Sequence, residues 1–487
     1  MFAQEKELFK LTKCVFEIVN EVTTIVRGLS HEDRELLYDD YGFYDENYKN
    51  NPRVQSGLWD GKYRFFTKGG LTYTLLLEEI YTSVVKLGYE VDVQDKRTGL
   101  IPNYSIINAD IFSNCFDKYN QPFSLRPYQC KVANLLLDNM NGIVVAATSA
   151  GKGSIICSMS KAMTEKTKES KVVIIVPNTT LVSQSINECK QFNLDVGEFS
   201  GTTKDLNHQI VVSTRQTLNK QPDTLKQFNA LIVDECHSSQ AACLKKLLTE
   251  YAQHISMRFG VTGTMPKNKA KNYMVKSCLG PVRYTISAKW LQDNGYISTI
   301  KIKHLVLTEN VDSDSFPDYD SEVMFISRPQ RIAKIAQLIL DYSGEFPEKN
   351  ILCLVNHKKV GHMLEQMIDA DLYVDGDMKP PKKRIETFNR YAKEDGLKGV
   401  ATFGVAFIGL SQDRINTMFI VDVGKSFIKV IQSVGRGLRK GGGKNHIDVF
   451  DVSSSMNWSQ KHRKDRNVFY NEAEYPYTTQ RIDVEKP

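Results

Sequence analysis

The sequence predicts an α/β protein with two parallel-sheet domains in tandem, preceded by a small accessory domain that mixes helices and strands. Three observations support this prediction. Two series of short β-branched runs alternate with helical segments, the first between residues 142 and 263 and the second between 302 and 452. A small-residue turn follows the first of these runs, and residues 41 to about 93 have a different composition, in which basic and aromatic residues interleave.

The composition is that of a globular protein without a membrane span. The chain has 487 residues, 41% of them hydrophobic and 25% charged, which suits about three domains of roughly 150 residues each. Its net charge of +6 is compatible with a polyanionic partner. Nine scattered cysteines without a CxxC pair indicate reduced thiols, not a disulfide framework or a zinc ribbon. Because the N-terminus does not resemble a signal peptide and no apolar run approaches ~18 residues, we expect a cytoplasmic protein.

Residues 1–95 are assigned to the accessory domain. Up to about residue 40 the apolar residues have helical spacing, which is interrupted at Gly28; they include Phe9, Val15, Ile18, Val22 and Ile25. Between residues 41 and 93, cations that could contact phosphates stand beside aromatic faces that could stack on bases, and Arg53, Trp59 and Lys62 are the candidate DNA contacts. A small β-rich domain whose aromatic residues form its core is the alternative for the same composition.

A polar, irregular segment, residues 96–122, is predicted to link this domain to the first α/β domain, residues 123–295. The strand-like runs of that domain are 142–147, 171–177, 209–213, 230–235 and 258–263. The second α/β domain, residues 296–460, has its own series at 302–307, 351–356, 372–376, 399–404, 417–423 and 447–452. Its helices are expected at 328–342 and 381–393, and residues 461–487 are predicted to form a C-terminal tail. Continuous apolar strands separated by helices predict parallel sheets covered on both faces, which bind ligands at the carboxyl ends of their strands.

The turn AATSAGKGS, residues 146–154, has the pattern of a phosphate-binding loop between a strand and a helix. Its backbone N–H groups would surround a phosphate, and Lys152 would reach the terminal phosphates of a nucleotide. The loop residues assigned to ATP are Thr148, Ser149, Ala150, Gly151, Lys152, Gly153 and Ser154. The hydroxyl residue expected after the lysine, a ligand for Mg²⁺, is replaced by Gly153. Either Ser154 or Thr148 takes its place, or the metal depends more on water and on a carboxylate from another strand; an ordinary glycine-rich turn is the alternative for the whole segment.

Two further segments carry the groups that ATP hydrolysis needs. Asp234 and Glu235 end a predicted strand, where Asp234 would hold Mg²⁺ and Glu235 would polarise the attacking water. In the second domain, Gln432, Arg436 and Arg439 share one face of a predicted helix. From there the two guanidinium groups would reach the γ-phosphate and stabilise the charge of the transition state. A solvated basic surface, or a contact with a nucleic-acid backbone, is the alternative for such a helix.

With these segments in place, residues 123–460 resemble a superfamily 2 helicase, which implies two RecA-like domains. LRPYQ (125–129) is similar to the adenine-recognising segment, with Arg126 and Gln129, and is followed by the phosphate loop, VPNTTLVSQ (176–184), STRQTL (213–218), DECH (234–237) and TGT (262–264). The second domain continues in the order of the family with LVNHKKVGHML (354–364), ATFGVAFIGLS (401–411) and QSVGRGLR (432–439). The pattern departs from many members at Ser411, where they have an acidic residue.

The resemblance implies roles for residues that the chemistry alone does not single out. Gly409 would join the ATP site, and His237, Thr262 and Thr264 would couple hydrolysis to domain motion. The implied DNA contacts are Pro177, Asn178, Thr179, Gln184, Thr214, Gln216, Asn356, His357 and Thr402.

The N-terminal stretch NPRVQSGLWDGKYRFF resembles the accessory domain of phage UvsW-type branched-DNA helicases. This implies an ATP- and Mg²⁺-dependent enzyme that unwinds or branch-migrates forks, D-loops and Holliday junctions in phage recombination, repair and replication, with 3′ to 5′ movement, and that acts in the host bacterial cytoplasm. Single-stranded, forked and junction DNA are the expected partners, RNA in R-loops is a further one, and a monomer is favoured. A duplex translocase or strand-annealing remodeller without net unwinding, and an ATPase-impaired DNA-binding scaffold, are the alternatives.

Overall fold

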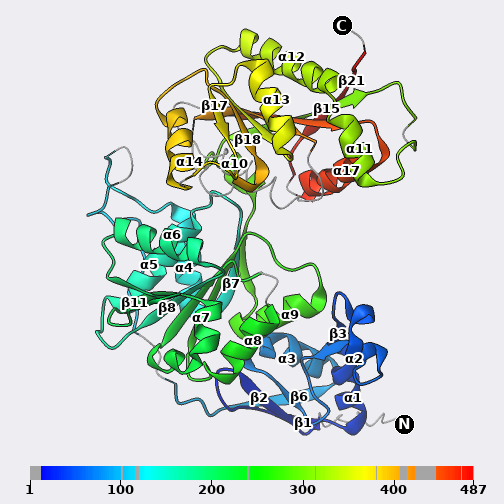
Figure 1. Cartoon of the computed structure of the whole chain (residues 1–487). Helices are drawn as coiled ribbons and strands as arrows, with labels where there is room; N and C mark the ends of the chain where they lie inside the picture. Colours follow the sequence, from blue (N-terminus) through cyan, green and yellow to red (C-terminus); the bar gives the residue numbers. More distant parts are fainter. Residues whose placement is uncertain are drawn as a thin grey trace, which may run out of the picture. The chain divides into compact units, whose positions relative to one another are not determined.

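A computed structural model describes residues 12–99, 103–116, 120–237, 241–312, 314–379, 381–405, 414–422, 446–472 and 474–485 (Figure 1). The chain forms two compact units. The first comprises Met1–Ala146 and Gly151–Ile286, and the second comprises Ala147–Ala150 and Ser287–Pro487. Among the described residues, no helix is long and apolar enough to cross a membrane.

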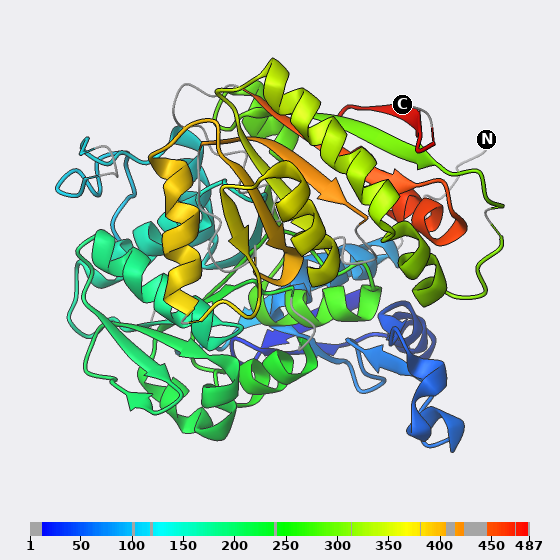
Figure 2. The ribbon, with the colours of Figure 1, turned by 45° about the horizontal axis from the view of Figure 1, so that its top comes forward.

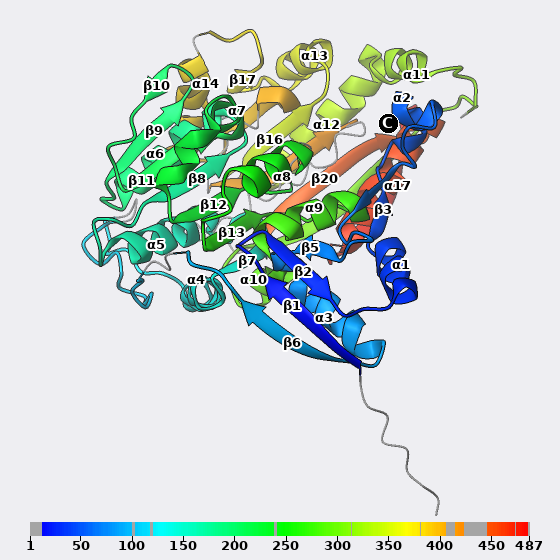
Figure 3. The ribbon, with the colours of Figure 1, turned by 90° about the horizontal axis from the view of Figure 1, so that it is seen from below.

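The accessory domain is built on a four-stranded sheet with the order β5-β2-β1-β6 (Figure 3). Its strands are β1 (Thr12–Ile18), β2 (Thr23–Arg27), β5 (Leu71–Tyr73) and β6 (Tyr89–Asp95), and its helices are α1 (His31–Asp40) and α3 (Leu77–Lys86). Strands β1 and β6 are parallel, and the other two pairs are antiparallel. Between α1 and β5, a two-stranded sheet of β3 (Gly42–Tyr44) and β4 (Lys62–Arg64) carries the 3-10 helix η1 (Tyr48–Asn50) and α2 (Pro52–Gln55).

The helix predicted up to residue 40 is wrong for residues 12–27, and residues 1–11 lie outside the described residues. Residues 12–27 form a hairpin in which Cys14, Phe16 and Ile18 are buried at every second position. This alternation of period two is the signature of a strand with one buried face. Within the described residues the first helix, α1, begins after Ser30, whose hydroxyl accepts a hydrogen bond from the Asp33 N–H and so caps α1.

The first α/β domain contains an eight-stranded sheet with the order β10-β9-β11-β8-β12-β13-β7-β14, in which only β10 is antiparallel to its neighbour. The strands are β7 (Asn141–Ala146), β8 (Val172–Val176), β9 (Val196–Ser200), β10 (Thr203–Lys204), β11 (Ile210–Thr214), β12 (Ala230–Asp234), β13 (Met257–Thr262) and β14 (Val282–Ile286). Helices α4 (Pro127–Asn139), α5 (Lys152–Thr164) and α6 (Thr179–Gln191) pack together on one face, and α7 (Arg215–Lys220), α8 (Ala241–Glu250) and α9 (Lys269–Leu279) on the other (Figure 1). Every residue of β8, β11 and β13 is buried, as expected for strands covered on both faces.

The second α/β domain has a seven-stranded, fully parallel sheet with the order β17-β18-β16-β19-β20-β15-β21. The strands are β15 (Thr299–Thr308), β16 (Asn350–Val355), β17 (Leu372–Val374), β18 (Lys398–Thr402), β19 (Ile415–Val421), β20 (His446–Ser454) and β21 (Tyr477–Asp483). Helices α12 (Pro329–Glu345) and α13 (Lys358–Ile368) lie side by side across one face (Figure 2). Further helices are α10 (Ala288–Asp293), α11 (Tyr319–Ile326), α14 (Pro381–Phe388) followed by η4 (Asn389–Ala392), and α17 (Asn457–Glu472). Two tandem parallel-sheet domains are thereby confirmed.

Residues 461–487, predicted to be a tail, contribute to this second sheet. Helix α17 packs against β20, where the buried Arg466 donates from Nε and Nη2 to the two carboxylate oxygens of Asp451, both at 2.8 Å. Strand β21 then pairs with β15 over its whole length and ends the sheet. The predicted domain boundary at 460 is therefore too early, because β15 is completed by a strand near the end of the chain.

The accessory domain and the first α/β domain share one hydrophobic core. Tyr273 of α9 packs its ring against Phe43 and Phe65, with centroids 4.5 and 5.4 Å apart, and its hydroxyl donates to Glu79 of α3 at 2.5 Å. Lys276, one turn further along α9, pairs with the same Glu79 at 2.9 Å. The two regions therefore form one compact unit, although their sequence compositions differ.

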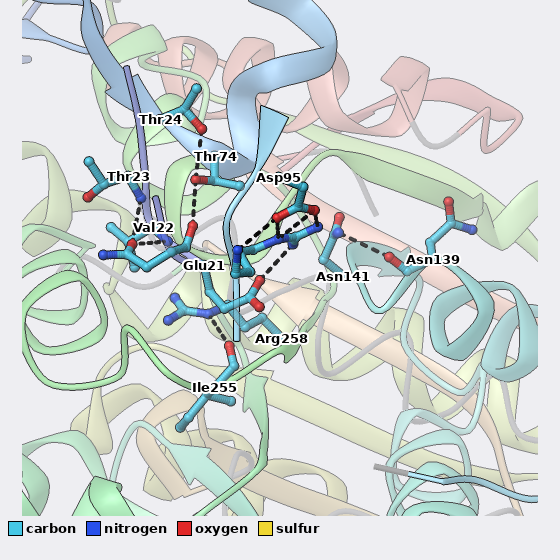
Figure 4. Close-up of polar contacts among 12 residues, drawn as sticks. Glu21, Val22, Thr23, Thr24, Thr74, Asp95, Asn139, Asn141, Ile255 and Arg258 are labelled. Atoms are coloured by element: carbon cyan, nitrogen blue, oxygen red, sulfur yellow. Dashed lines mark hydrogen bonds and ion pairs between the residues drawn. The ribbon is translucent and has the colours of Figure 1, made fainter. Parts of the chain in front are cut away.

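A polar network joins the same two regions beside the turn between β1 and β2 (Figure 4). Arg97 donates to Glu21 at 2.9 Å and to Asp95 at 2.6 Å, and the Glu21 N–H donates to the Gln253 carbonyl at 3.3 Å. Arg258, fully buried on β13, donates from Nε to the Ile255 carbonyl at 2.9 Å. Burial lowers the pKa of Arg258 to about 10 and raises the pKa of Glu21, so both charges depend on the contacts around them.

Candidate ATPase site and nucleic-acid contacts

The predicted phosphate loop connects β7 to α5, whose first residue is Lys152. Ser149 and Gly151 have positive φ angles of 68° and 80°, which turn the chain sharply before the helix begins. Gly151 needs to be glycine because a Cβ there would collide with the side-chain amide nitrogen of Gln129. The turn therefore brings the N-terminus of α5, with its unpaired N–H groups, to the carboxyl edge of the sheet.

Gln129 is held against this turn by the start of α4. Its Oε1 accepts a hydrogen bond from the Arg126 N–H at 2.9 Å, and the Arg126 guanidinium donates to the Tyr128 hydroxyl at 3.1 Å. Gln129 is only 4% exposed. The structure thus brings the predicted adenine-recognising residues, Arg126 and Gln129, next to the predicted phosphate loop.

Lys152, Glu235, His237 and Thr262 form a continuous polar chain across the carboxyl ends of three neighbouring strands, β7, β13 and β12. Lys152 Nζ donates to Glu235 Oε1 at 2.5 Å, and His237 Nδ1 lies 3.2 Å from Glu235 Oε2. His237 Nδ1 is also 2.6 Å from Thr262 Oγ1. Glu235 has a positive φ of 48° and donates its N–H to Asp234 Oδ1 at 2.9 Å, so a tight turn presents the two carboxylates in succession.

Burial and neighbouring charges shift the pKa values of Asp234 and Glu235 in opposite directions. Burial, and then repulsion from Glu235, raises the pKa of Asp234. Burial alone would raise the pKa of Glu235 as well, but the hydrogen bond with His237 and the charge of Lys152 outweigh it and hold this pKa below its usual range. Glu235 is therefore ionised and able to orient a water molecule, whereas Asp234 lies where an added cation would be stabilised.

The predicted coupling residues lie in the same chain of contacts. Thr262, at the end of β13 and fully buried, donates its hydroxyl to the Thr264 carbonyl at 2.8 Å while it contacts His237. Cys236, between the acidic pair and His237, is buried, which raises the pKa of its thiol and keeps it protonated. The structure gives Cys236 a packing role.

We predict that His237→Ala lowers ATP turnover by about tenfold or more, the loss typical when a hydrogen-bond partner of an active-site group is removed. Without the imidazole, one of the two groups that fix the Glu235 carboxylate is missing. Phosphate release at saturating ATP measures the effect, and the exposed histidine variant His362→Ala is the matched control. Equal turnover of the two variants would contradict the prediction.

Most of the predicted DNA contacts of the first domain lie where β8 and β11 end, and three of the predicted contacts already have structural partners. Gln184 is exposed on α6, where its Nε2 donates to Glu188 Oε1 at 2.9 Å. Asn178 caps α6 by accepting from the Leu181 N–H at 3.0 Å, and Thr214 caps α7 by accepting from the Thr217 N–H at 3.2 Å. Thr214 is only 3% exposed, so its side chain is occupied by this cap. Thr179 and Gln216 are exposed, and Pro177 is half-buried. In the second domain, Asn356 and His357 follow β16 and are exposed, whereas Thr402 ends β18 and is buried.

The basic and aromatic residues of the accessory domain divide into two groups. Phe65 and Phe66 are buried in the core, which confirms the packing alternative for them. On the surface, the rings of Tyr44 and Tyr48 stack with centroids 4.4 Å apart and Lys62 Nζ lies 5.0 Å from the Tyr44 ring.

The other predicted contacts lie on the same small sheet and its helix. Trp59 donates its indole N–H to the Lys62 carbonyl at 3.0 Å, which fixes the ring, and Arg53 is exposed on α2. Among the described residues, neither Arg53 nor Lys62 forms an ion pair, whereas Arg64 pairs with Asp60 and Lys68 with Glu35, both at 2.7 Å. Arg53 and Lys62 therefore keep their charges available.

Several predicted site residues lie outside the described residues, namely Gly409, Gln432, Arg436 and Arg439. The sequence did not single out Glu188, a carboxylate on α6 that lies against Gly153 of the phosphate loop. The feature of the sequence that could have indicated such a residue is the missing hydroxyl at Gly153, because a loop that lacks one oxygen ligand leaves room for a side chain from elsewhere.

A fold of two parallel-sheet domains, with the predicted phosphate loop beside an acidic pair, is the arrangement expected of a P-loop ATPase of the helicase type. Residues 122–267 match the family "Type III restriction enzyme, res subunit". The chain is similar to the ATP-dependent DNA helicase uvsW of Enterobacteria phage T4, with 25% identity over 92% of this chain and 95% of that protein. It is also 25% identical to the putative helicase 22 of Sulfolobus islandicus filamentous virus, over 72% of this chain and 68% of that protein.

Among solved structures, the ATP-dependent Type ISP restriction-modification enzyme LlaBIII bound to DNA matches with a TM-score of 0.56 and 14% identity, covering 84% of this chain and 36% of that one. At this identity the match shows a shared fold. The sequence relatives and the family match confirm the predicted resemblance to helicases and the predicted helicase-type enzyme.

Proposed function

We propose that this protein is an ATP-dependent DNA helicase or translocase that acts on branched DNA in phage recombination, repair and replication. The observation that carries this proposal is the polar chain from Lys152 through Glu235 and His237 to Thr262, which links the phosphate loop to the two strands beside it. Through such a chain of contacts, hydrolysis of a bound nucleotide can change the positions of secondary-structure elements, as a motor requires.

In the proposed reaction, Lys152 and the N–H groups at the start of α5 hold the phosphates of ATP. Glu235 orients the attacking water, and His237 keeps the carboxylate in place from the other side. Mg²⁺, when bound, neutralises the developing phosphate charge, and Asp234 is the carboxylate that would hold it. Arg436 and Arg439 of the second domain are proposed to contact the γ-phosphate, and Gln432 and Gly409 are proposed to bind ATP.

The donor set fits a magnesium ion held jointly by protein and nucleotide. Among the described residues, no group of three or more His, Cys, Asp or Glu side chains could hold a metal by itself. Mg²⁺ in nucleotide sites typically binds one or two carboxylates, with phosphates and water as its other ligands. The half-buried Asp234 beside Glu235 is consistent with this arrangement.

ATP hydrolysis measured at fixed salt with different nucleic acids tests the proposal. The unaltered protein should be stimulated by DNA, most strongly by forks and four-way junctions, relative to single-stranded DNA, RNA or no nucleic acid. A strand-displacement assay on the same substrates separates a helicase from a duplex translocase or annealing remodeller. Rates at the level of a Glu235→Gln background with every nucleic acid would contradict the proposed motor and favour the scaffold.

We propose that the exposed basic and aromatic surface of the accessory domain, defined by Arg53, Trp59 and Lys62, contacts the branched DNA. The double variant Arg53→Ala/Lys62→Ala should reduce the slope of log affinity against log salt by about 1 for each phosphate that the protein no longer neutralises. Lys86→Ala, an exposed change on α3, serves as the control. Fluorescence anisotropy with a labelled fork measures both slopes, and an unchanged slope in the double variant would remove this surface from the DNA interface.

A further inference from the structure

The space beside Gly153 is filled by the carboxylate of Glu188. A Cβ at residue 153 would collide with Glu188 Oε2 and would lie 2.7 Å from Glu188 Cδ, closer than real Cβ contacts. Residue 153 is the position where the pattern of a phosphate loop predicts a hydroxyl group. A carboxylate from another helix therefore occupies the place next to the missing ligand.

Glu188 is oriented by its own helix. Gln184, one turn earlier on α6, donates from Nε2 to Glu188 Oε1 at 2.9 Å, while Oε2 is the oxygen nearest to residue 153. Helices α5 and α6 pack against each other, and the thiols of Cys157 and Cys189 meet between them with sulfur atoms 3.8 Å apart. The carboxylate is therefore held at the start of α5 by packing and by a hydrogen bond.

Among the described residues, no neighbouring cation neutralises the charge of Glu188. In the part of the chain that the structure describes, Glu188 forms no ion pair, and Lys152, which lies next to Gly153 in the sequence, pairs with Glu235. Glu188 also lies close enough to Asp234 for electrostatic repulsion between the two carboxylates. Two carboxylates thus lie near each other beside the predicted phosphate loop, an arrangement that repels a bare triphosphate and attracts a divalent cation.

We propose that Glu188 provides an oxygen ligand for the Mg²⁺ that accompanies the nucleotide, in place of the hydroxyl that Gly153 lacks. The proposal rests on the proposed function, since it requires a nucleotide at the phosphate loop. It explains why residue 153 is glycine: only glycine leaves room for the carboxylate at this position. A purely structural Glu188, which merely fills space between α5 and α6, is the alternative that the experiment must separate.

The variant Glu188→Gln keeps the shape of the side chain and removes its charge. Binding of a fluorescent ATP analogue to the full-length protein, followed by anisotropy over a range of Mg²⁺ concentrations and in EDTA, gives a readout that does not depend on turnover. The Mg²⁺ concentration for half-maximal binding should rise by about tenfold or more. Affinity in EDTA should stay the same or improve, because a negative charge near the phosphates has been removed. Glu165→Gln, an exposed change at the other end of α5, is the matched control and should leave both values unchanged.

A second pair of variants returns the hydroxyl to the loop. Glu188→Ala should weaken Mg²⁺-dependent binding, and the double variant Gly153→Thr/Glu188→Ala should recover it, because removal of the carboxylate makes room for a Cβ and its hydroxyl. Thermal unfolding midpoints of all variants verify that each is folded. An unchanged Mg²⁺ curve in Glu188→Gln, an equal loss of affinity with and without Mg²⁺, or no recovery in the folded double variant would overturn the proposal. Failure of the unaltered protein to bind the nucleotide at any Mg²⁺ concentration would instead overturn the proposed function.

Discussion

Replacing Lys152 with alanine should reduce ATP hydrolysis by about 10³-fold or more, the scale expected when a positioned charge is removed from a site where negative charge develops. Lys152 is the first residue of α5 and reaches Glu235 at 2.5 Å, so it stands between the phosphate loop and the residue assigned to the attacking water. Phosphate release in the presence of forked DNA measures the loss. Retained turnover would contradict the assignment of residues 146–154 as a phosphate loop.

The Lys152→Ala variant should keep much of its DNA binding, because the proposed DNA contacts lie on other elements. Lys161→Ala, a lysine further along α5 that donates to the Ile111 carbonyl, is a suitable control for the removal of a lysine from this helix. Anisotropy with labelled DNA, measured without nucleotide, separates loss of chemistry from loss of the fold. A parallel loss of DNA binding and unfolding midpoint would mean that Lys152 serves the fold of the domain.

Replacing Glu235 with glutamine should lower turnover by about 10²- to 10⁴-fold, the range for removal of a proton acceptor from a catalytic site. The amide oxygen of glutamine can still accept the hydrogen bond from Lys152. The neutral amide cannot take a proton from water, and it carries no negative charge to interact with His237. Nucleotide binding should be preserved. Single-turnover hydrolysis, compared with equilibrium binding of the fluorescent analogue, makes this distinction.

Asp234→Asn is the informative companion to Glu235→Gln, because the two neighbouring carboxylates are assigned different roles. The Asp234 variant should shift the Mg²⁺ dependence of binding, whereas the Glu235 variant should mainly slow hydrolysis. The same profile for both variants would show that the acidic pair acts as one unit and would contradict the separate assignments.

The two parallel sheets could be predicted because their strands are continuous β-branched runs. Such short apolar runs are typical of strands that are buried on both faces. The helical prediction for residues 12–27 is wrong because short amphipathic strands with isolated apolar residues can satisfy helical spacing over two or three turns. Strand β21 could not be predicted since its residues are mostly exposed and polar, and only its pairing with β15 makes it a strand. Because β15 and β21 are far apart in the sequence, their pairing produces no pattern within residues 477–483 that would predict a strand.

The site could be predicted where chemistry depends on neighbours in sequence, as in the turn before Lys152 or the pair Asp234 and Glu235. It could not be predicted where the partner comes from another helix. In the sequence, Glu188 is an ordinary acidic residue of a helix with many polar positions, and only the fold places its carboxylate next to Gly153. The same holds for Thr214, a predicted DNA contact whose side chain is occupied in capping α7.

The shared core of the accessory domain and the first α/β domain has a consequence for synthesis of the protein. Glu79 on α3 and its partner Tyr273 on α9 are 194 residues apart, so the apolar surface around α3 is made long before the helix that covers it. At a translation rate of about 5–20 residues per second, that surface would wait roughly 10–40 s for α9 to leave the ribosome. During this interval Phe43 and Phe65 lack the Tyr273 ring that packs on them in the finished unit. Nascent chains stopped before α9 should therefore bind chaperones, and chains stopped beyond β14 should release them.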